Sequence, residues 1–142
     1  RSSMSPSMII HSGVPQGSVL SPSLFNFFTS DFPLLAPFSH SFADDFYTSA
    51  SSSNLATIAK TLNENMALVE AWADAKLLTI APLKSSITLF TPDSHQSHVH
   101  PQVFYKGELI PLNKTPKWLG NIVDSRFNSS YHATDLDTRL SR

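Results

Sequence analysis

The sequence has no cysteine, only four glycines and few charged residues, which make up 15% of its 142 positions. The lack of cysteine excludes disulfides and thiolate metal sites. A formal net charge of −1 argues against a large surface for non-specific binding of polyanions. No apolar run approaches the ~20 residues that a membrane-spanning helix requires, and the polar start at 1–6 does not resemble a secretory signal. We therefore expect an intracellular protein without a membrane segment.

Hydrophobic residues form 41% of the chain, enough for one modest core, and two segments repeat them at helical spacing. The longer segment runs from Leu55 to about Ala73, and Asn54 precedes it as a candidate N-cap. The shorter segment begins at Ser21, also a candidate N-cap, and stops before Pro33. The residues of the shorter helix that we expect to face the core are Leu24, Phe25 and Phe28.

Segments rich in β-prone residues alternate with turn residues over the rest of the chain. The expected single strands lie at 8–11, 77–80, 87–90 and 118–123, and the expected hairpins at 41–48 and 103–112. The first hairpin would turn at Asp44-Asp45 and the second at Lys106-Gly107. One antiparallel sheet with helices packed on one face, an α+β fold, accommodates these elements.

The adjacent carboxylates Asp44 and Asp45 are the strongest chemical feature. Two neighbouring anions on a turn repel each other unless a cation lies between or above them. Mg²⁺ suits this position, because it accepts one or two protein carboxylates together with phosphate oxygens and water. An aspartate pair taken alone is more often an ordinary turn, since aspartate is a preferred turn residue.

A second motif favours the metal-binding interpretation. The stretch GVPQGSVLSPSLFN, from Gly13 to Asn26, resembles the motif that follows the first catalytic strand in reverse transcriptases of non-LTR retrotransposons and group II introns. The FADD segment at 42–45 resembles the aromatic-Ala-Asp-Asp signature of the same family, with Phe42 in place of the commoner tyrosine. The resemblance continues through the segment around Lys84 and through a Trp-Leu-Gly sequence at 118–120.

This resemblance implies a role for each matching residue. Asp44 and Asp45 would bind catalytic Mg²⁺ or Mn²⁺, and Lys84 would lie near the triphosphate as a catalytic cation. The residues expected near the incoming nucleotide and the template base are Pro15, Gln16, Gly17 and Phe42. The residues expected to contact the primer are Lys117, Leu119 and Gly120. The implied partners are an RNA template, a DNA primer and a deoxynucleoside triphosphate, and the implied compartment is the nucleus.

The resemblance also implies how the chain is divided. It predicts a partial palm over 8–92, a palm-to-thumb connection with a primer-grip-like segment over 93–124, and the start of a C-terminal region over 125–142. The first catalytic aspartate of the family lies upstream of a motif like the one at Gly13. We therefore expect an incomplete palm without fingers, thumb or first catalytic strand. The parent polymerase would perform two-metal nucleotidyl transfer, and this chain would be inactive alone.

Other interpretations remain open. A non-catalytic nucleic-acid-binding module would gather four lysines on one face, namely Lys84, Lys106, Lys114 and Lys117. A remnant of a mobile element without function is a further alternative. An RNA-dependent RNA polymerase also uses paired acids, but the Pro-Gln-Gly context at 15–17 argues against it. His95, His98 and His100 lie in a loop, where histidines are seldom metal ligands. Trp72 and Trp118 are expected in the core.

Overall fold

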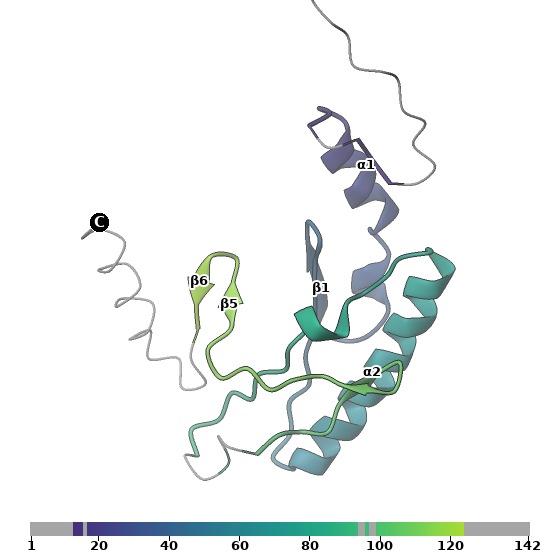
Figure 1. Cartoon of the computed structure of the whole chain (residues 1–142). Helices are drawn as coiled ribbons and strands as arrows, with labels where there is room; N and C mark the ends of the chain where they lie inside the picture. Colours follow the sequence, from purple (N-terminus) through teal and green to yellow (C-terminus); the bar gives the residue numbers. More distant parts are fainter. Residues whose placement is uncertain (1–12, 16, 94–95, 97–98, 124–142) are drawn as a thin grey trace, which may run out of the picture.

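The computed structural model describes residues 13–15, 17–93, 96 and 99–123 (Figure 1). The strand expected at 8–11 and the C-terminal region expected at 125–142 lie outside these residues. The elements follow one another as α1 (Ser21–Phe28), η1 (Phe32–Leu34), β1 (Ser39–Phe42), β2 (Asp45–Thr48), α2 (Leu55–Ala75), η2 (Pro82–Lys84), β3 (Phe104–Tyr105), β4 (Glu108–Leu109), β5 (Lys117–Trp118) and β6 (Asn121–Ile122).

The long helix α2 forms as the sequence predicts. The Asn54 side chain accepts a hydrogen bond of 2.8 Å from the backbone N–H of Ala56, so the predicted N-cap is confirmed. The apolar repeat places one face of α2 against the core, and the buried residues of this face are Leu62, Asn65, Val69, Trp72 and Ala73. The other elements of the core pack against this face.

Three aromatic rings from different elements meet at the centre of the core. Phe32 of η1 is 1% exposed, and its ring lies 4.7 Å from that of Phe46 on β2 and 5.1 Å from that of Trp72 on α2. The rings of Phe46 and Trp72 are 5.4 Å apart. The Trp72 indole N–H donates to the Asp31 carboxylate at 3.0 Å, and Lys76 forms an ion pair with the same carboxylate at 3.0 Å. The core prediction for Trp72 is confirmed.

In the described part of the chain, the strands form three separate two-stranded antiparallel sheets, β1–β2, β3–β4 and β5–β6. The coarse α+β prediction is confirmed, whereas the expected single sheet is wrong. Segments 77–80 and 87–90 are not strands, although Ile87 forms an isolated parallel bridge with Leu112. Leu77 has a positive φ of 55°, outside the range of a strand, and the 3-10 helix η2 interrupts the extended backbone between the two segments.

Two of the hairpins turn on consecutive residues with positive φ. Lys106 and Gly107 have φ values of 50° and 80° between β3 and β4, at the turn that the sequence predicts. Leu119 and Gly120 have φ values of 49° and 87° between β5 and β6. Positive φ at both central residues is typical of type I′ turns, whose twist matches that of the flanking strands. The single strand expected at 118–123 is therefore wrong, because this turn folds the segment into a hairpin.

Helix α1 differs from prediction at both its start and its packing. Leu20 occupies the N-cap position without a side-chain cap, and the Ser21 hydroxyl instead donates to the carbonyl of Pro15 at 2.5 Å. Leu24 and Phe28 are 53% and 41% exposed, so the expectation that they face the core is wrong. Figure 1 shows α1 extending away from α2, which leaves its apolar face beyond the reach of the core. Within the described residues, no helix combines the length and the apolar character needed to cross a membrane.

The carboxylate of Asp31 gives the folded chain a specific sensitivity to acid. Hydrogen bonds from Trp72 and Lys76 lower the pKa of Asp31 below its ordinary value of 3.8. The stability that this group contributes is therefore present above pH 3.8 and is lost as the pH falls through the lowered pKa. Urea denaturation between neutral and acidic pH should show a shallower acid loss for Asp31→Asn than for the unmodified chain. The exposed Glu108→Gln variant is the control, and an equal acid loss in both variants would contradict this role of Asp31.

Candidate functional site

The acidic pair lies at the tip of the β1–β2 hairpin. Phe42 pairs with Asp45 across the hairpin, so Ala43 and Asp44 form the two-residue turn. The predicted hairpin is confirmed, whereas its turn lies one residue earlier than expected, because Asp45 is the first residue of β2. Ala43 has a φ of 51°, a region that a residue with a Cβ adopts at some cost. Both aspartates are exposed. The two paired strands β1 and β2 thus present both carboxylates to solvent at the tip of the hairpin.

One face of this hairpin is fastened to the core. Side chains alternate between the two faces of a strand, so Phe46 and Thr48 share the face that meets the helices. The Thr48 hydroxyl accepts hydrogen bonds from Ser39 at 3.3 Å and from the Asn65 amide of α2 at 2.9 Å. Phe46 lies in the aromatic cluster with Phe32 and Trp72. These contacts with α2 and with the aromatic cluster hold the hairpin, and with it the acidic turn, in position.

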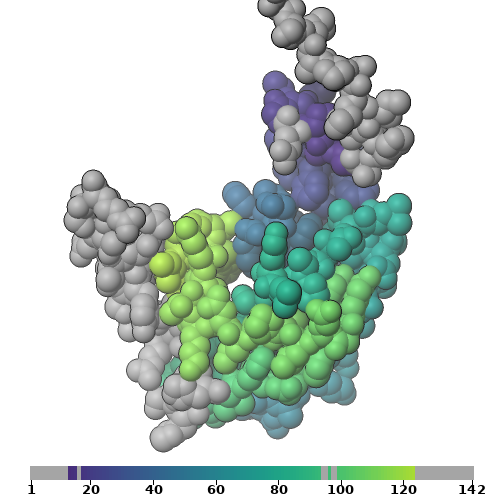
Figure 2. Space-filling model, in the orientation of Figure 1, coloured from purple at the N-terminus to yellow at the C-terminus, as the bar shows by residue number. Residues whose placement is uncertain are grey.

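The opposite face of the hairpin carries His40, Phe42, Asp45 and Tyr47. On this face the Tyr47 ring packs against Trp118 of β5, with ring centroids 5.3 Å apart and a tilt of 45°. Figures 1 and 2 show the β5–β6 segment beside the β1–β2 hairpin on the same side of the molecule. Trp118 is 43% exposed, so its expected place in the core is wrong. It joins two hairpins at the surface instead.

The tyrosine–tryptophan contact brings two sets of expected site residues together. Asp45 is two residues from Tyr47 on the same face of β2, and Trp118 is flanked by Lys117 and by the Leu119-Gly120 turn. Sequence reasoning did not identify Tyr47. The signal was available in the strand alternation, which places position 47 on the face of position 45.

The acidic turn offers few ligands of its own for a metal ion. Among the residues that the structure describes, no cluster of three or more aspartate, glutamate or histidine side chains is arranged to hold a metal. Asp44 and Asp45 provide exposed carboxylate oxygens, the donors that Mg²⁺ prefers. This donor set fits an ion that takes one or two protein carboxylates and completes its shell with water and substrate phosphates.

The remaining expected site residues lie on other elements. The Pro15 carbonyl accepts from the Ser18 N–H at 3.3 Å, and Gly17 has a φ of 83°, so the glycine permits the turn before α1. Gln16 lies outside the described residues. Lys84 is exposed at the end of η2. Within the described part of the chain, no hydrogen bond or ion pair links Pro15, Gly17 or Lys84 to the acidic hairpin.

The structure adds little support for the two alternative sites considered from the sequence, a basic face of lysines and a histidine cluster. Lys106 forms an ion pair with Asp74 at 2.5 Å, which neutralises one of the four lysines proposed for a basic face. The His100 ring nitrogen Nε2 lies 2.9 Å from the carbonyl oxygen of Ile110, a contact within the protein. His95 and His98 lie outside the described residues.

Comparison with known proteins gives the family. The model of the family described as reverse transcriptase (RNA-dependent DNA polymerase) matches residues 6–123. The chain belongs to this family, as its two motifs predict. No solved structure gives a significant match.

Three curated relatives come from mobile elements of Drosophila melanogaster. The chain is 29% identical over 145 residues to the RNA-directed DNA polymerase from mobile element jockey, with 96% of this chain and 15% of the relative covered. It is 30% identical over 145 residues to the probable RNA-directed DNA polymerase from transposon BS, with 93% of this chain and 16% of the relative covered. It is 30% identical over 141 residues to that from transposon X-element, with 92% of this chain and 15% of the relative covered. The chain thus spans about one sixth of the length of these relatives.

The environment of Tyr47 predicts a specific sensitivity to alkali. Burial, reinforced by the Asp45 carboxylate, raises the pKa of Tyr47 from 10.0 to about 12. The stability from this site is complete below pH 10.0 and is lost as the pH rises from 10.0 to about 12. Urea denaturation across this range should show a shallower loss for Tyr47→Phe than for the unmodified chain. The Tyr47→Phe variant should still lose some stability as the pH rises, because burial also raises the pKa of Tyr105. An unchanged slope would show that Tyr47 ionises freely in the folded chain.

Proposed function

We propose that the Asp44-Asp45 hairpin is the metal-binding part of the polymerising centre of an RNA-directed DNA polymerase from a non-LTR retrotransposon. The whole polymerase would extend a DNA primer on an RNA template by two-metal nucleotidyl transfer. The observation that carries this proposal is the contact between Tyr47 and Trp118, 5.3 Å between ring centroids. It supports a centre in which exposed carboxylates and the expected primer-contacting turn act side by side.

The two carboxylates would hold Mg²⁺ or Mn²⁺ as catalytic residues. Bound metal supplies activation of the primer hydroxyl and stabilisation of the leaving pyrophosphate. Asp44 lies in the turn and Asp45 begins β2, so both offer oxygens from a backbone that the β1–β2 pairing holds. Because the described residues add no third ligand, substrate phosphates and the remaining polymerase would complete the coordination.

The β5–β6 hairpin would hold the end of the primer next to the metal. Lys117 is exposed on β5 and forms no ion pair within the described part of the chain, so its ammonium is available to a backbone phosphate. Leu119 and Gly120 shape the turn through their positive φ values of 49° and 87°. Packing of Trp118 on Tyr47 would keep this turn in register with the carboxylates.

The nucleotide would approach the outward face of the acidic hairpin. Phe42 is 62% exposed and shares the face of Asp45, so its ring is free to contact a base or sugar. The expected contacts to the incoming nucleotide and template base from the turn before α1 are Pro15, Gln16 and Gly17. Lys84 would offset charge that develops on the leaving pyrophosphate.

The family relationship supports a division of labour along the chain. We propose a partial palm over 8–92, a palm-to-thumb connection over 93–124 and the start of a C-terminal region over 125–142. The fingers, the thumb and the first catalytic aspartate would come from the remainder of the polymerase. The polymerase would act in the nucleus on its RNA template.

Metal titration tests the proposed role of the carboxylates. Calorimetry of the full chain should show Mn²⁺ or Mg²⁺ binding that disappears in the Asp44→Asn plus Asp45→Asn variant, because the amides carry no charge. Glu108→Gln is the matched control, since Glu108 is exposed and also follows a hairpin turn. Equal binding by all three proteins would place the metal elsewhere and contradict the proposal.

Primer contact is tested separately on Lys117. The full chain should bind a DNA primer annealed to an RNA template more weakly after Lys117→Ala, and the slope of log affinity against log salt should fall by about 1. Lys60→Ala is the control, because Lys60 is exposed on α2 and pairs with Glu64. An unchanged salt slope for Lys117→Ala, or an equal change for Lys60→Ala, would contradict the proposed contact between β5 and the primer.

A further inference from the structure

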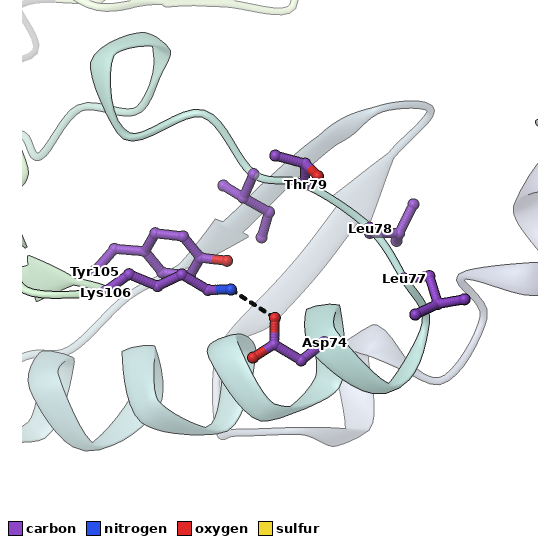
Figure 3. Close-up of a pocket in the computed structure, with 7 residues that line it drawn as sticks. Asp74, Leu77, Leu78, Thr79, Tyr105 and Lys106 are labelled. Carbon is purple, nitrogen blue, oxygen red and sulfur yellow. Dashed lines mark hydrogen bonds and ion pairs between the residues drawn. The ribbon is translucent and has the colours of Figure 1, made fainter.

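A crevice separate from the acidic hairpin lies beyond the end of α2. It has a volume of about 290 Å³ and is lined by Asp74, Leu77, Thr79, Ile80, Tyr105 and Lys106, among others. Figure 3 shows segment 77–80 along one side of the crevice, with Tyr105 and Lys106 of the β3–β4 hairpin facing it and Asp74 of α2 below. None of these residues belongs to the proposed polymerising centre, so the inference does not rest on the proposed function.

The Tyr105 hydroxyl is buried in this crevice without a partner. Tyr105 is 3% exposed, and its hydroxyl oxygen forms no hydrogen bond with the described residues. In Figure 3 the hydroxyl points into the space between segment 77–80 and α2. Burial raises the pKa of Tyr105, so the group remains a hydrogen-bond donor. A buried donor without an acceptor is costly and uncommon in folded proteins, which points to an acceptor from outside the described residues.

Segment 77–80 has the features of a strand that lacks its neighbour. Leu78 and Ile80 are half-buried and Thr79 between them is exposed, the alternation expected of a strand, whereas Leu77, with a φ of 55°, forms the turn before them. The Leu78 N–H donates to the carbonyl of Ala73 at 2.8 Å, which fastens the start of the segment to α2. The backbone N–H groups of Thr79 and Ile80 form no hydrogen bond with other described residues. The sequence predicts a strand here, and the missing component is a pairing partner.

The charges around the crevice favour a polypeptide over a nucleic acid. Its one lysine, Lys106, is neutralised by Asp74 at 2.5 Å, so no unpaired cation of the lining is available to a phosphate. Leu77, 92% exposed, and the half-buried Leu78 and Ile80 offer apolar surface instead. A main chain in extended conformation supplies carbonyl acceptors and a matching row of amides in one molecule.

We propose that this crevice is a docking site for an extended polypeptide segment, which adds as a strand to residues 78–80. The backbone of the added segment pairs with Thr79 and Ile80, and one of its carbonyls accepts a hydrogen bond from the Tyr105 hydroxyl. Main-chain pairing provides most of the affinity, and the neutral Lys106–Asp74 pair favours uncharged side chains.

The test uses the full chain and a defined peptide, acetyl-Val-Thr-Val-Thr-Val-amide. Titration followed by amide NMR should shift Thr79, Ile80 and Tyr105, and hydrogen exchange at Thr79 and Ile80 should slow in the complex. Tyr105→Phe should weaken peptide binding roughly three- to tenfold, the usual effect of one hydrogen bond. The melting temperature of the free Tyr105→Phe chain should not fall, because the lost hydroxyl has no partner in the free chain.

Two further probes separate the possible results. A peptide N-methylated at every residue keeps its carbonyls but loses the pairing amides of both strand edges, and it should neither bind nor protect Thr79 and Ile80. N-methylacetamide carries the same amide without an extended chain. If it shifts Tyr105 as strongly as the peptide while Thr79 and Ile80 exchange freely, the crevice is a small-molecule site and strand docking is wrong. Absence of peptide binding, equal binding by Tyr105→Phe, or a lower melting temperature of that variant would each overturn the proposal.

Discussion

The packing of Phe46 between Phe32 and Trp72 is the contact on which the arrangement of this chain depends. These three rings join η1, β2 and α2, with ring centroids 4.7 to 5.4 Å apart. An isolated two-stranded hairpin is only marginally stable in water, so β1–β2 needs this anchor. Because strand side chains alternate, Phe46, which is half-buried against the core, places Asp45 and Tyr47 on the opposite, outward face. One apolar contact thus determines the exposure of the acidic turn.

The same constraint explains why the two expected functional turns meet. With Tyr47 turned outward, its ring is available to Trp118, and the β5–β6 hairpin packs against β2 through that contact. Aromatic pairs in a tilted arrangement gain energy beyond the area they bury. Asp31 helps to hold the Trp72 ring in place, because its carboxylate accepts a hydrogen bond from the Trp72 indole and forms an ion pair with Lys76. The acidic turn and the turn expected to contact the primer are therefore connected through a short path of packed rings.

The core occupies only part of the described chain, and several apolar surfaces lie outside it. Helix α1 presents Leu24 and Phe27 at 53% and 81% exposure, and segment 77–80 begins with an almost fully exposed Leu77. The two regions differ in kind. The exposed side chains of α1 named above are apolar, whereas segment 77–80 borders the buried Tyr105 hydroxyl. Unsatisfied hydrogen-bonding groups specify the geometry of a partner far more closely than apolar area does, so the crevice supports a defined inference and the α1 face does not.

Local chemistry was enough to predict much of this chain from its sequence. The repeat of apolar residues and the amide of Asn54 specified α2, and the turn residues specified the hairpins at Asp44 and at Lys106-Gly107. The motifs at 13–26 and 42–45 specified the family. These features depend on neighbours within a few positions. The packing of α1, the division into three small sheets and the Tyr47–Trp118 contact depend on segments up to 71 positions apart, and a sequence pattern does not state which exposed face meets which. Only the tertiary structure decided those contacts, because burial is shared between distant segments that compete for one small core.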